Sequence, residues 1–449
     1  MYRLVLVHVI ITYNITCINT NVKHIFVFFQ LFITCLVLVV KLIEAPDPIE
    51  VEFGIDNTMN REELMVIYFS MGYTAMQIHT FLTMRHGMMF SLRHLRRLMW
   101  RLGLYSRGRP SNMNDIVDAI TTELNGSGRL LGYRSMWQRL TTLYGLRVSQ
   151  NVTRLLLGVM DPGGVALRTR GRLHRRQYIC RGPNHVWHID GLDKLKQFGF
   201  AVHACIDGFS RKVLWLHVGR SNNNPAIIAG FYLETIKRLN CVPRIVRSDR
   251  GTENGRVRLF QIALRLNHND SLSGYRSFRY GRSTANQRVE CFWSQLRRMV
   301  THFWINFFKD MRDDGVFDNS DPVQVECMRF CFTRVLQADF DRAVELWNNH
   351  RIRPQNNREC PSGKPNMMYF LPQRFGTTDQ SKPLLFGENE MDEAAIQYCE
   401  EYPPYGCSND FVNVVELIIG SNIENCEMPT TANQALYLYT SLMELIDDL

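Results

Sequence analysis

Three acidic residues in this chain have types and positions that fit one chemistry. Asp190 ends the apolar run VWHID and Asp249 ends RIVRSD, and both runs are predicted to be buried strands. Glu290 lies in the first turns of a predicted helix, beside its apolar stripe. Buried strands rarely carry a lone carboxylate, because burial disfavours the charge. Each acid alone is explained by a turn or a helix cap, whereas the three together predict a shared site.

A shared site of three carboxylates predicts a metal centre. Like charges at close quarters disfavour one another's ionised forms. A hard divalent cation, Mg²⁺ or Mn²⁺, removes that cost, because it accepts oxygen ligands, keeps several waters and leaves positions open for a phosphate. Two such ions could activate a water or a 3′-hydroxyl and stabilise the departing oxygen of a phosphoryl transfer. We expect no small-molecule cofactor.

The acids can meet only if the elements that carry them pack together. The hydrophobic pattern predicts these elements in order: strands in HVWHID, FGFAVHACID and KVLWLHV, a helix from Pro225 to about Asn240, a strand at 244–249, a helix from Thr252 to about Leu266, a weaker strand at 275–281 and a long helix from about Val289. This order predicts an α/β fold with a mixed five-stranded sheet flanked by helices. If the fourth strand pairs beside the first, Asp190 and Asp249 emerge at one edge of the sheet.

Three sequence blocks resemble a known enzyme family. WHIDG, RSDRGTEN and GRSTANQRVECFW are similar to the three blocks of the retroviral-integrase catalytic core, which insertion-sequence and eukaryotic DNA-transposon enzymes share. The resemblance covers residues 181–304. It implies an RNase-H-like fold with a D, D, E metal triad at Asp190, Asp249 and Glu290, and a structural role for Asp207. The second spacing, 41 residues, exceeds the usual retroviral interval, so we expect an enlarged loop from 267 to 283.

Residues around the triad are candidates for contact with DNA. Arg282, Asn286 and Arg288 flank Glu290 at the start of its helix, where backbone N–H groups and basic side chains suit phosphate. An ordinary surface charge is the alternative for each. His188 shares a strand face with Asp190, and we expect it to pack or to support the site, since hard metal ions prefer oxygen.

Two helical segments precede the predicted core. Between residues 60 and 104 the pattern predicts three helices, with Thr74 and Ser91 as N-caps of the second and third. Leucines form the inner stripe of the third helix, and four arginines face outward: Arg93, Arg96, Arg97 and Arg101. This pattern predicts a DNA-binding helix-turn-helix, because four arginines on one helix repel one another unless an anion is present. A plain helical scaffold with a solvated basic face is the alternative.

The second helical segment repeats the pattern of the first. GYRSMWQRL and the residues after it predict a helix around 136–144, a turn at Gly145 and a helix from Ser149 to Leu157, which Asp161-Pro-Gly-Gly stops. With the first segment, it is similar to the DNA-end-binding units of insertion-sequence-like transposases. We predict these divisions of the chain: an apolar leader (1–50), a helix-turn-helix (51–107), a second helix-turn-helix unit (108–170), a catalytic core (171–310), a helical extension (311–372) and an acidic, partly disordered tail (373–449).

Charge is distributed unevenly along the chain. From Gln373 onward there are 14 acids and two bases, so the tail has a net charge of −12 and the rest of the chain +21. A basic body with an acidic tail is typical of nucleic-acid binders, although other soluble proteins show it too.

The twelve cysteines lack metal-binding or disulfide-framework spacing, which indicates reduced thiols. The apolar run from Ile25 to Val40 is interpreted either as a membrane anchor or, as we prefer, as a segment extraneous to the folded body.

These observations predict an integrase- or transposase-like protein. We expect it to bind DNA, both transposon ends and target, to cut and join it with two Mg²⁺ or Mn²⁺ ions, and to form a homo-oligomer, as the resemblance implies. It would act in the nucleus if the source is a eukaryote. Two alternatives stay open: a host-adapted, non-catalytic DNA-binding regulator derived from a transposase, and an RNase-H-like nuclease that only hydrolyses.

Overall fold

A five-stranded mixed sheet forms the centre of the molecule. The computed structural model describes residues 55, 59–104, 110–168, 178–281, 286–354 and 361–447. The strands of the sheet are β1 (Val186–Leu192), β2 (Ala201–Asp207), β3 (Val213–Gly219), β5 (Ile245–Ser248) and β6 (Phe278–Tyr280). Their spatial order is β3-β2-β1-β5-β6, with β1–β2 and β2–β3 antiparallel and β1–β5 and β5–β6 parallel. The mixed sheet and the pairing of the fourth predicted strand beside the first are confirmed.

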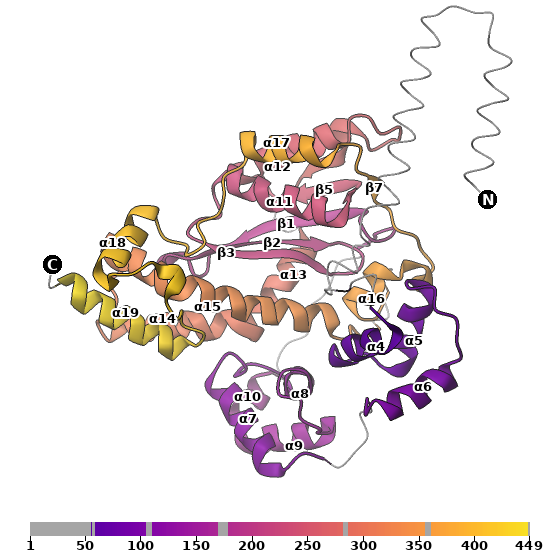
Figure 1. Cartoon of the computed structure of the whole chain (residues 1–449), viewed down its shortest axis with the longest axis horizontal. Helices are drawn as coiled ribbons and strands as arrows, with labels where there is room; N and C mark the ends of the chain where they lie inside the picture. The colour runs from indigo at the N-terminus through magenta and orange to yellow at the C-terminus, as the bar shows by residue number, and fades with distance from the viewer. Residues whose placement is uncertain are drawn as a thin grey trace, which may run out of the picture.

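Helices cover both faces of this sheet (Figure 1). One face carries α11 (Pro225–Leu239) and α12 (Gly255–Leu264), and the other carries α13 (Gln287–Leu296), α14 (His302–Asp313) and α15 (Pro322–Asn349). A π-helical turn at Arg297–Thr301 joins α13 to α14. Because strand side chains alternate between faces, Trp187 and Ile189 pack with α11, whereas Val202 and Ala204 belong to the core on the α13 side. The continuous burial of β2 reflects this coverage of both faces.

The first helical unit packs against the helical extension of the core. It consists of α4 (Arg61–Ser70), α5 (Ala75–Met84) and α6 (Leu92–Arg101), and the predicted N-caps Thr74 and Ser91 accept hydrogen bonds from the third backbone N–H of their helices. The Tyr73 hydroxyl donates to Asn349 Oδ1 (2.8 Å), and Arg85 Nε donates to the carbonyl oxygen of Phe370 in α16 (Pro365–Phe370) (2.9 Å). These contacts hold α4 and α5 beside α16 (Figure 1).

The second helical unit consists of α7 (Met113–Asn125), α8 (Tyr133–Thr142), α9 (Gln150–Met160) and α10 (Pro162–Arg168). Gly145 has φ +62° in the predicted turn, and Ser149 caps α9 as predicted. α9 ends at Met160 with Asp161 as its C-cap, so the predicted stop at Asp161-Pro-Gly-Gly is confirmed, but a further short helix follows at once. Pro162 starts α10, because its fixed φ suits the first turn of a helix and the Asp161 carboxylate accepts from the Gly164 N–H (3.0 Å).

The acidic C-terminal segment is folded over most of its length. It contains β7 (Lys382–Pro383), which pairs with β4 (Cys241–Val242), and the helices α17 (Glu388–Tyr398), α18 (Asn409–Ile419) and α19 (Ala432–Asp447). Phe411, Val415 and Tyr439 are buried in the same core as α15. The prediction of a partly disordered tail is therefore wrong for the described residues, because net charge hides the amphipathic pattern that buries these apolar side chains.

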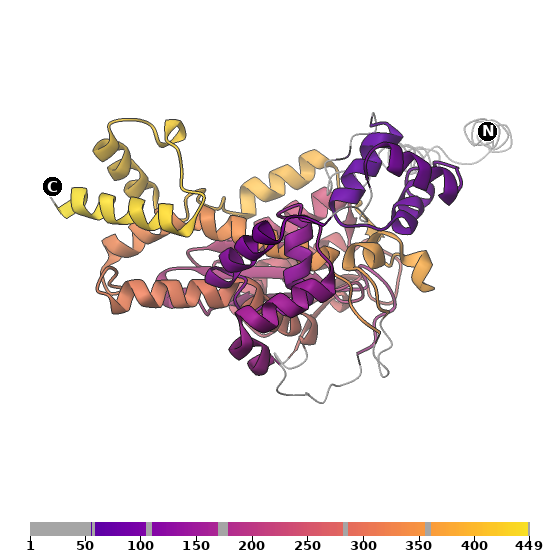
Figure 2. The same ribbon diagram turned by 90° about the horizontal axis from the view of Figure 1, so that it is seen from below.

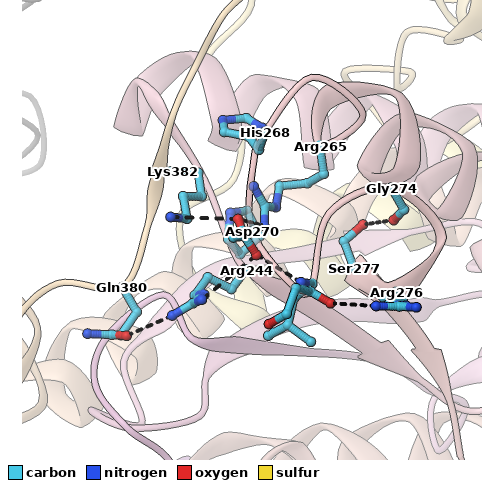
Figure 3. A network of polar contacts seen from close by, with 12 residues as sticks. Arg244, Arg265, His268, Asp270, Gly274, Arg276, Ser277, Gln380 and Lys382 are labelled. Atoms are coloured by element: carbon cyan, nitrogen blue, oxygen red, sulfur yellow. Dashed lines mark hydrogen bonds and ion pairs between the residues drawn. The ribbon is translucent and has the colours of Figure 1, made fainter.

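A charged cluster organises the long interval between α12 and β6 (Figure 3). Arg265 Nη2 donates to Asp270 Oδ2 at 2.7 Å, and Lys382 Nζ and Arg244 Nη2 lie 3.6 and 3.8 Å from the same carboxylate. Burial opposes ionisation of Asp270, but the hydrogen bonds from Arg265 and the Leu272 N–H dominate and lower its pKa to about 2. One acid thus ties together the end of α12, the residue before β5, and β7.

Among the described residues, no helix is both long enough and apolar enough to cross a membrane. The apolar run at 25–40 lies outside those residues, as does most of the arginine-rich stretch from 168 to 181.

Candidate active site

Asp190 lies on β1 where the strand faces α13. It pairs with Ala204 of β2, and Gly191 follows it. A Cβ atom on Gly191 would lie only 2.4 Å from Nδ2 of Asn222, and that amide donates to Asp193 Oδ1 (2.8 Å). A larger residue at 191 would displace the Asn222 side chain, which explains why glycine follows the aspartate.

Trp293 of α13 holds the Asp190 carboxylate in place. Its indole Nε1 donates to Asp190 Oδ2 at 2.8 Å. The sequence pattern assigns Trp293 only to the apolar stripe of its helix, so this role was not predicted. A signal was present, because a buried indole N–H needs an acceptor and the triad acids are the nearest candidates.

Neighbouring acids affect the ionisation of Asp190 and of Glu290. Burial raises the pKa of Asp190 to about 7, the Trp293 hydrogen bond opposes that rise, and the charges of Glu290 and Asp249 add to it. Burial raises the pKa of Glu290, and the charge of Asp249 raises it further. Asp249 directly follows β5, and its Oδ1 accepts from the Gly251 N–H (3.2 Å). The strand order and α13 thus bring the three carboxylates within electrostatic range of one another.

The donor set suits a hard cation, although the side chains do not form a closed metal cage. Among the described residues, no group of three or more His, Cys, Asp or Glu side chains is arranged to hold a metal ion. The triad offers only carboxylate oxygens, which Mg²⁺ and Mn²⁺ prefer. Burial and, after it, the charge of neighbouring acids raise the pKa values of Asp190 and Glu290, and a bound cation would relieve that repulsion. In donor chemistry and in charge, these residues fit the predicted metal.

A fourth acid lies in the same region. Burial raises the pKa of Glu253, and the charges of Asp249 and Asp193 raise it further. The Glu253 Oε1 atom accepts from Asn254 Nδ2 (2.7 Å). Glu253 was not among the predicted site residues, because its position at the start of a helix is explained equally well by favourable interaction with the helix dipole.

Asn286 fixes the start of α13 on the sheet. Its side chain is 1% exposed, its Oδ1 accepts from His188 Nδ1 (2.6 Å), and its Nδ2 donates to the Ile189 carbonyl (2.9 Å). The prediction that Asn286 contacts DNA is therefore wrong, because its polar atoms are used inside the protein. Burial lowers the pKa of His188 to about 3, so the ring is neutral and its Nε2 accepts from the Tyr178 hydroxyl (2.7 Å).

Comparison with known families identifies this part of the chain. Residues 177–368 match the family model described as "Integrase core domain". These residues form an integrase-like core. All three predicted acids lie within the matched segment, on β1, directly after β5 and on α13.

Comparisons with solved structures and with curated proteins give less information about this chain than the family model does. The chain is similar to a chain in the structure of the simian T-cell lymphotropic virus intasome in complex with PP2A regulatory subunit B56 gamma, with 16% sequence identity and a TM-score of 0.28. The match covers 58% of this chain and 76% of that one. A likeness at that score carries no argument about function. No curated protein matches the chain.

Of the other predicted residues of the integrase-like core, two make contacts within the protein and one lies outside the described residues. Arg288 Nε donates to the Gly208 carbonyl (3.0 Å), and its guanidinium lies over the Tyr178 ring at 3.9 Å, so it makes contacts within the protein. Arg282 lies outside the described residues. Asp207 is buried and accepts from the N–H of Asn184 (2.8 Å) and the hydroxyl of Ser210 (2.6 Å), which agrees with the structural role implied for it.

The four arginines of the first helical unit lie outside the integrase-like core. Each is exposed on α6, on the side opposite the buried Leu95 and Leu98, as predicted: Arg93, Arg96, Arg97 and Arg101.

Proposed function

We propose that this protein is a DNA integrase or transposase that cuts and joins DNA with two Mg²⁺ or Mn²⁺ ions. The carrying observation is that three acids from separate elements of an integrase-like core lie close together: beyond the effect of burial, the charges of Glu290 and Asp249 raise the pKa of Asp190. A carboxylate that only caps a helix or ends a strand does not need two other acids beside it.

The residues of the proposed site have different roles. Asp190, Asp249 and Glu290 would hold the ions, which supply Lewis-acid activation of the attacking oxygen and stabilisation of the leaving oxygen. Trp293 orients the Asp190 carboxylate through its 2.8 Å hydrogen bond. Asn286 and His188 position the first turn of α13, and therefore Glu290, on β1. Because the pKa of Asp190 is about 7 without an ion, protons compete with the metal below neutral pH.

DNA is the proposed partner, both as transposon ends and as target. The exposed arginines of α6 give the first helical unit a face that suits a phosphate backbone. We further propose a homo-oligomer, because joining two DNA ends needs more than one active site, and action in the nucleus if the source is a eukaryote.

Two substitutions test the catalytic role. Asp190→Asn and Glu290→Gln should abolish Mg²⁺-dependent strand transfer of a labelled transposon end while DNA binding persists. Glu393→Gln, which changes an exposed acid on α17, is the matched control and should keep activity. Full activity in Asp190→Asn would refute the assignment.

The same assay separates the alternative functions. DNA binding by the unaltered protein without any nicking in Mg²⁺ would favour a non-catalytic regulator. Cleavage without joining of the 3′-hydroxyl to target DNA would favour a nuclease that only hydrolyses.

A further inference from the structure

Two neighbouring cavities lie between the second helical unit and the integrase-like core. Their volumes are about 450 and about 440 Å³, and Leu130 and Arg298 line both of them. One wall comes from the loop between α7 and α8 and from α8 itself, and the other comes from α13, its π-turn, α14 and the end of α15. We call these two cavities together the interdomain cleft.

Hydrogen bonds from α8 fix the width of the cleft. Arg139 Nη2 donates to the carbonyl oxygen of Met299 in the π-turn (2.8 Å), and Gln138 Nε2 donates to that of Leu346 in α15 (3.0 Å). Arg139 Nη1 also donates to Glu123 Oε2 at 2.6 Å, and both side chains of this ion pair are buried. The second unit thus lies against the core at defined contacts, as Figures 1 and 2 also show.

The larger cavity is lined by positive charge. Arg134, Arg298 and Arg353 reach it from α8, the π-turn and the segment after α15, and each is exposed. The described residues that line this cavity include no acid. Arginines gathered from three elements repel one another unless an anion lies between them.

The start of α8 adds a further attraction for anions. Gly132 is its N-cap and provides no side-chain hydrogen bond to the first turn, and Gly132 and Ser135 both line the cavity. The backbone N–H groups of an uncapped first turn are donors, and the helix dipole favours negative charge there.

The smaller cavity has the same electrostatic character. Arg129 and His302 line it, with Asp310 as the single acid among its lining residues. Burial lowers the pKa of His302, and the charges of Arg297, Arg129 and Lys309 lower it further. Burial is the main cause of this shift, and the three cations that add to it indicate a positive potential in this part of the cleft.

We propose that the interdomain cleft binds backbone phosphates of the DNA strand that enters the integrase-like core. The proposal rests on the proposed function for its ligand. Arg298 follows Glu290 by eight residues on a continuous helix, which places it about 12 Å further along the axis. At a rise of about 3.4 Å per nucleotide, the bound phosphates lie roughly three or four nucleotides from the reacting one. The second helical unit then acts as a clamp beside the active site.

Salt-dependent DNA binding by the full chain tests this assignment. Arg134→Gln combined with Arg353→Gln should lower the slope of log K against log salt by roughly two, since each phosphate contact contributes about 0.9. Affinity for a labelled duplex should fall about tenfold or more at moderate salt. Arg154→Gln, an exposed arginine on α9 that does not line the cleft, is the matched control. The measurement is made without Mg²⁺, so its outcome is independent of strand transfer.

An unchanged salt slope in a double variant that melts at the temperature of the unaltered protein would overturn the proposal. Tripolyphosphate is the probe for a free anion. If it raises the melting temperature of the unaltered protein but not of the double variant, while DNA affinity is equal in both, the cleft is a site for a soluble anion and the DNA assignment is wrong. If strand transfer is absent from the unaltered protein but the double variant still loses salt slope, the proposed function fails and the DNA cleft stands.

Discussion

The two helical units share local features but differ in whether the arginine-bearing helix contacts the core. In the first unit, α6 turns its arginines to solvent, and the hydrogen bonds to the rest of the chain come from α5 and the residues beside it: Gly72, Tyr73, Thr80 and Arg85. In the second unit, α8 itself makes the contacts through Gln138 and Arg139. Its arginine at position 134 therefore faces the core across a cleft.

This difference shows what determines the use of a basic helix. Glycine turns and serine caps specify where helices begin and end, and both units have them. A few polar side chains then decide which face is covered. We infer that the first unit presents an open DNA-binding face and that the second forms one wall of an internal binding site.

Removal of the charge on α6 should have the largest effect on DNA affinity. Replacement of Arg93, Arg96, Arg97 and Arg101 by glutamine removes up to four phosphate contacts, so the salt slope should fall by roughly 3.6 and affinity by roughly 100-fold or more. Fluorescence anisotropy with a labelled duplex over a salt series measures both. If the change is no larger than for Arg154→Gln, the first unit does not bind DNA and the contrast between the units fails.

Disruption of the buried ion pair of the second unit should have the largest effect on stability. Arg139→Met leaves Glu123 buried and uncompensated, which costs about 3–5 kcal/mol, and it also removes the hydrogen bond to Met299. Hydrogen exchange should then show faster opening of α7 and α8, while α4 and α5 are unaffected. The double variant Glu123→Leu with Arg139→Met should recover much of the loss. Equal protection of α7 and α8 in Arg139→Met and the unaltered protein would contradict the role of this pair.

The charged cluster around Asp270 is the counterpart of that ion pair inside the core. The pKa of Asp270 in the folded protein is about 2, below the ordinary value of 3.8. Its ionised form therefore stabilises the fold above about pH 4, and this contribution is lost as the pH falls toward 2. The shift corresponds to about 2 kcal/mol. Asp270→Asn should therefore lower the free energy of unfolding at pH 7 and have little effect near pH 2. Urea titrations at both values measure it, and an equal loss at both would show that the role is packing alone.

The sequence predicted the core better than the contacts around it. Strand alternation and helical spacing are local properties, so the sheet and α13 could be predicted, and with them the electrostatic proximity of Asp249 and Glu290 to Asp190. The part played by Trp293 and the burial of Asn286 depend on how α13 lies against β1, which no local pattern encodes. For the C-terminal segment, the acidic composition led to a wrong prediction of partial disorder, because the negative charge is on the surface of helices whose apolar faces are buried.

The smallest effect should come from the contact that holds the first unit in place. Tyr73→Phe removes the hydroxyl that donates to Asn349 Oδ1, but that oxygen still accepts from Asn366 Nδ2 (3.1 Å), so no buried acceptor is left unsatisfied. The loss should be about 0.5–1 kcal/mol in the free energy of unfolding, with DNA affinity unchanged. Tyr437→Phe, at a ring that is 75% exposed on α19, is the matched control for the chemical change. A loss above about 3 kcal/mol, or weaker DNA binding, would mean that the attachment of the first unit is as integral to the fold as that of the second, and the two units would then differ only in which face carries the arginines.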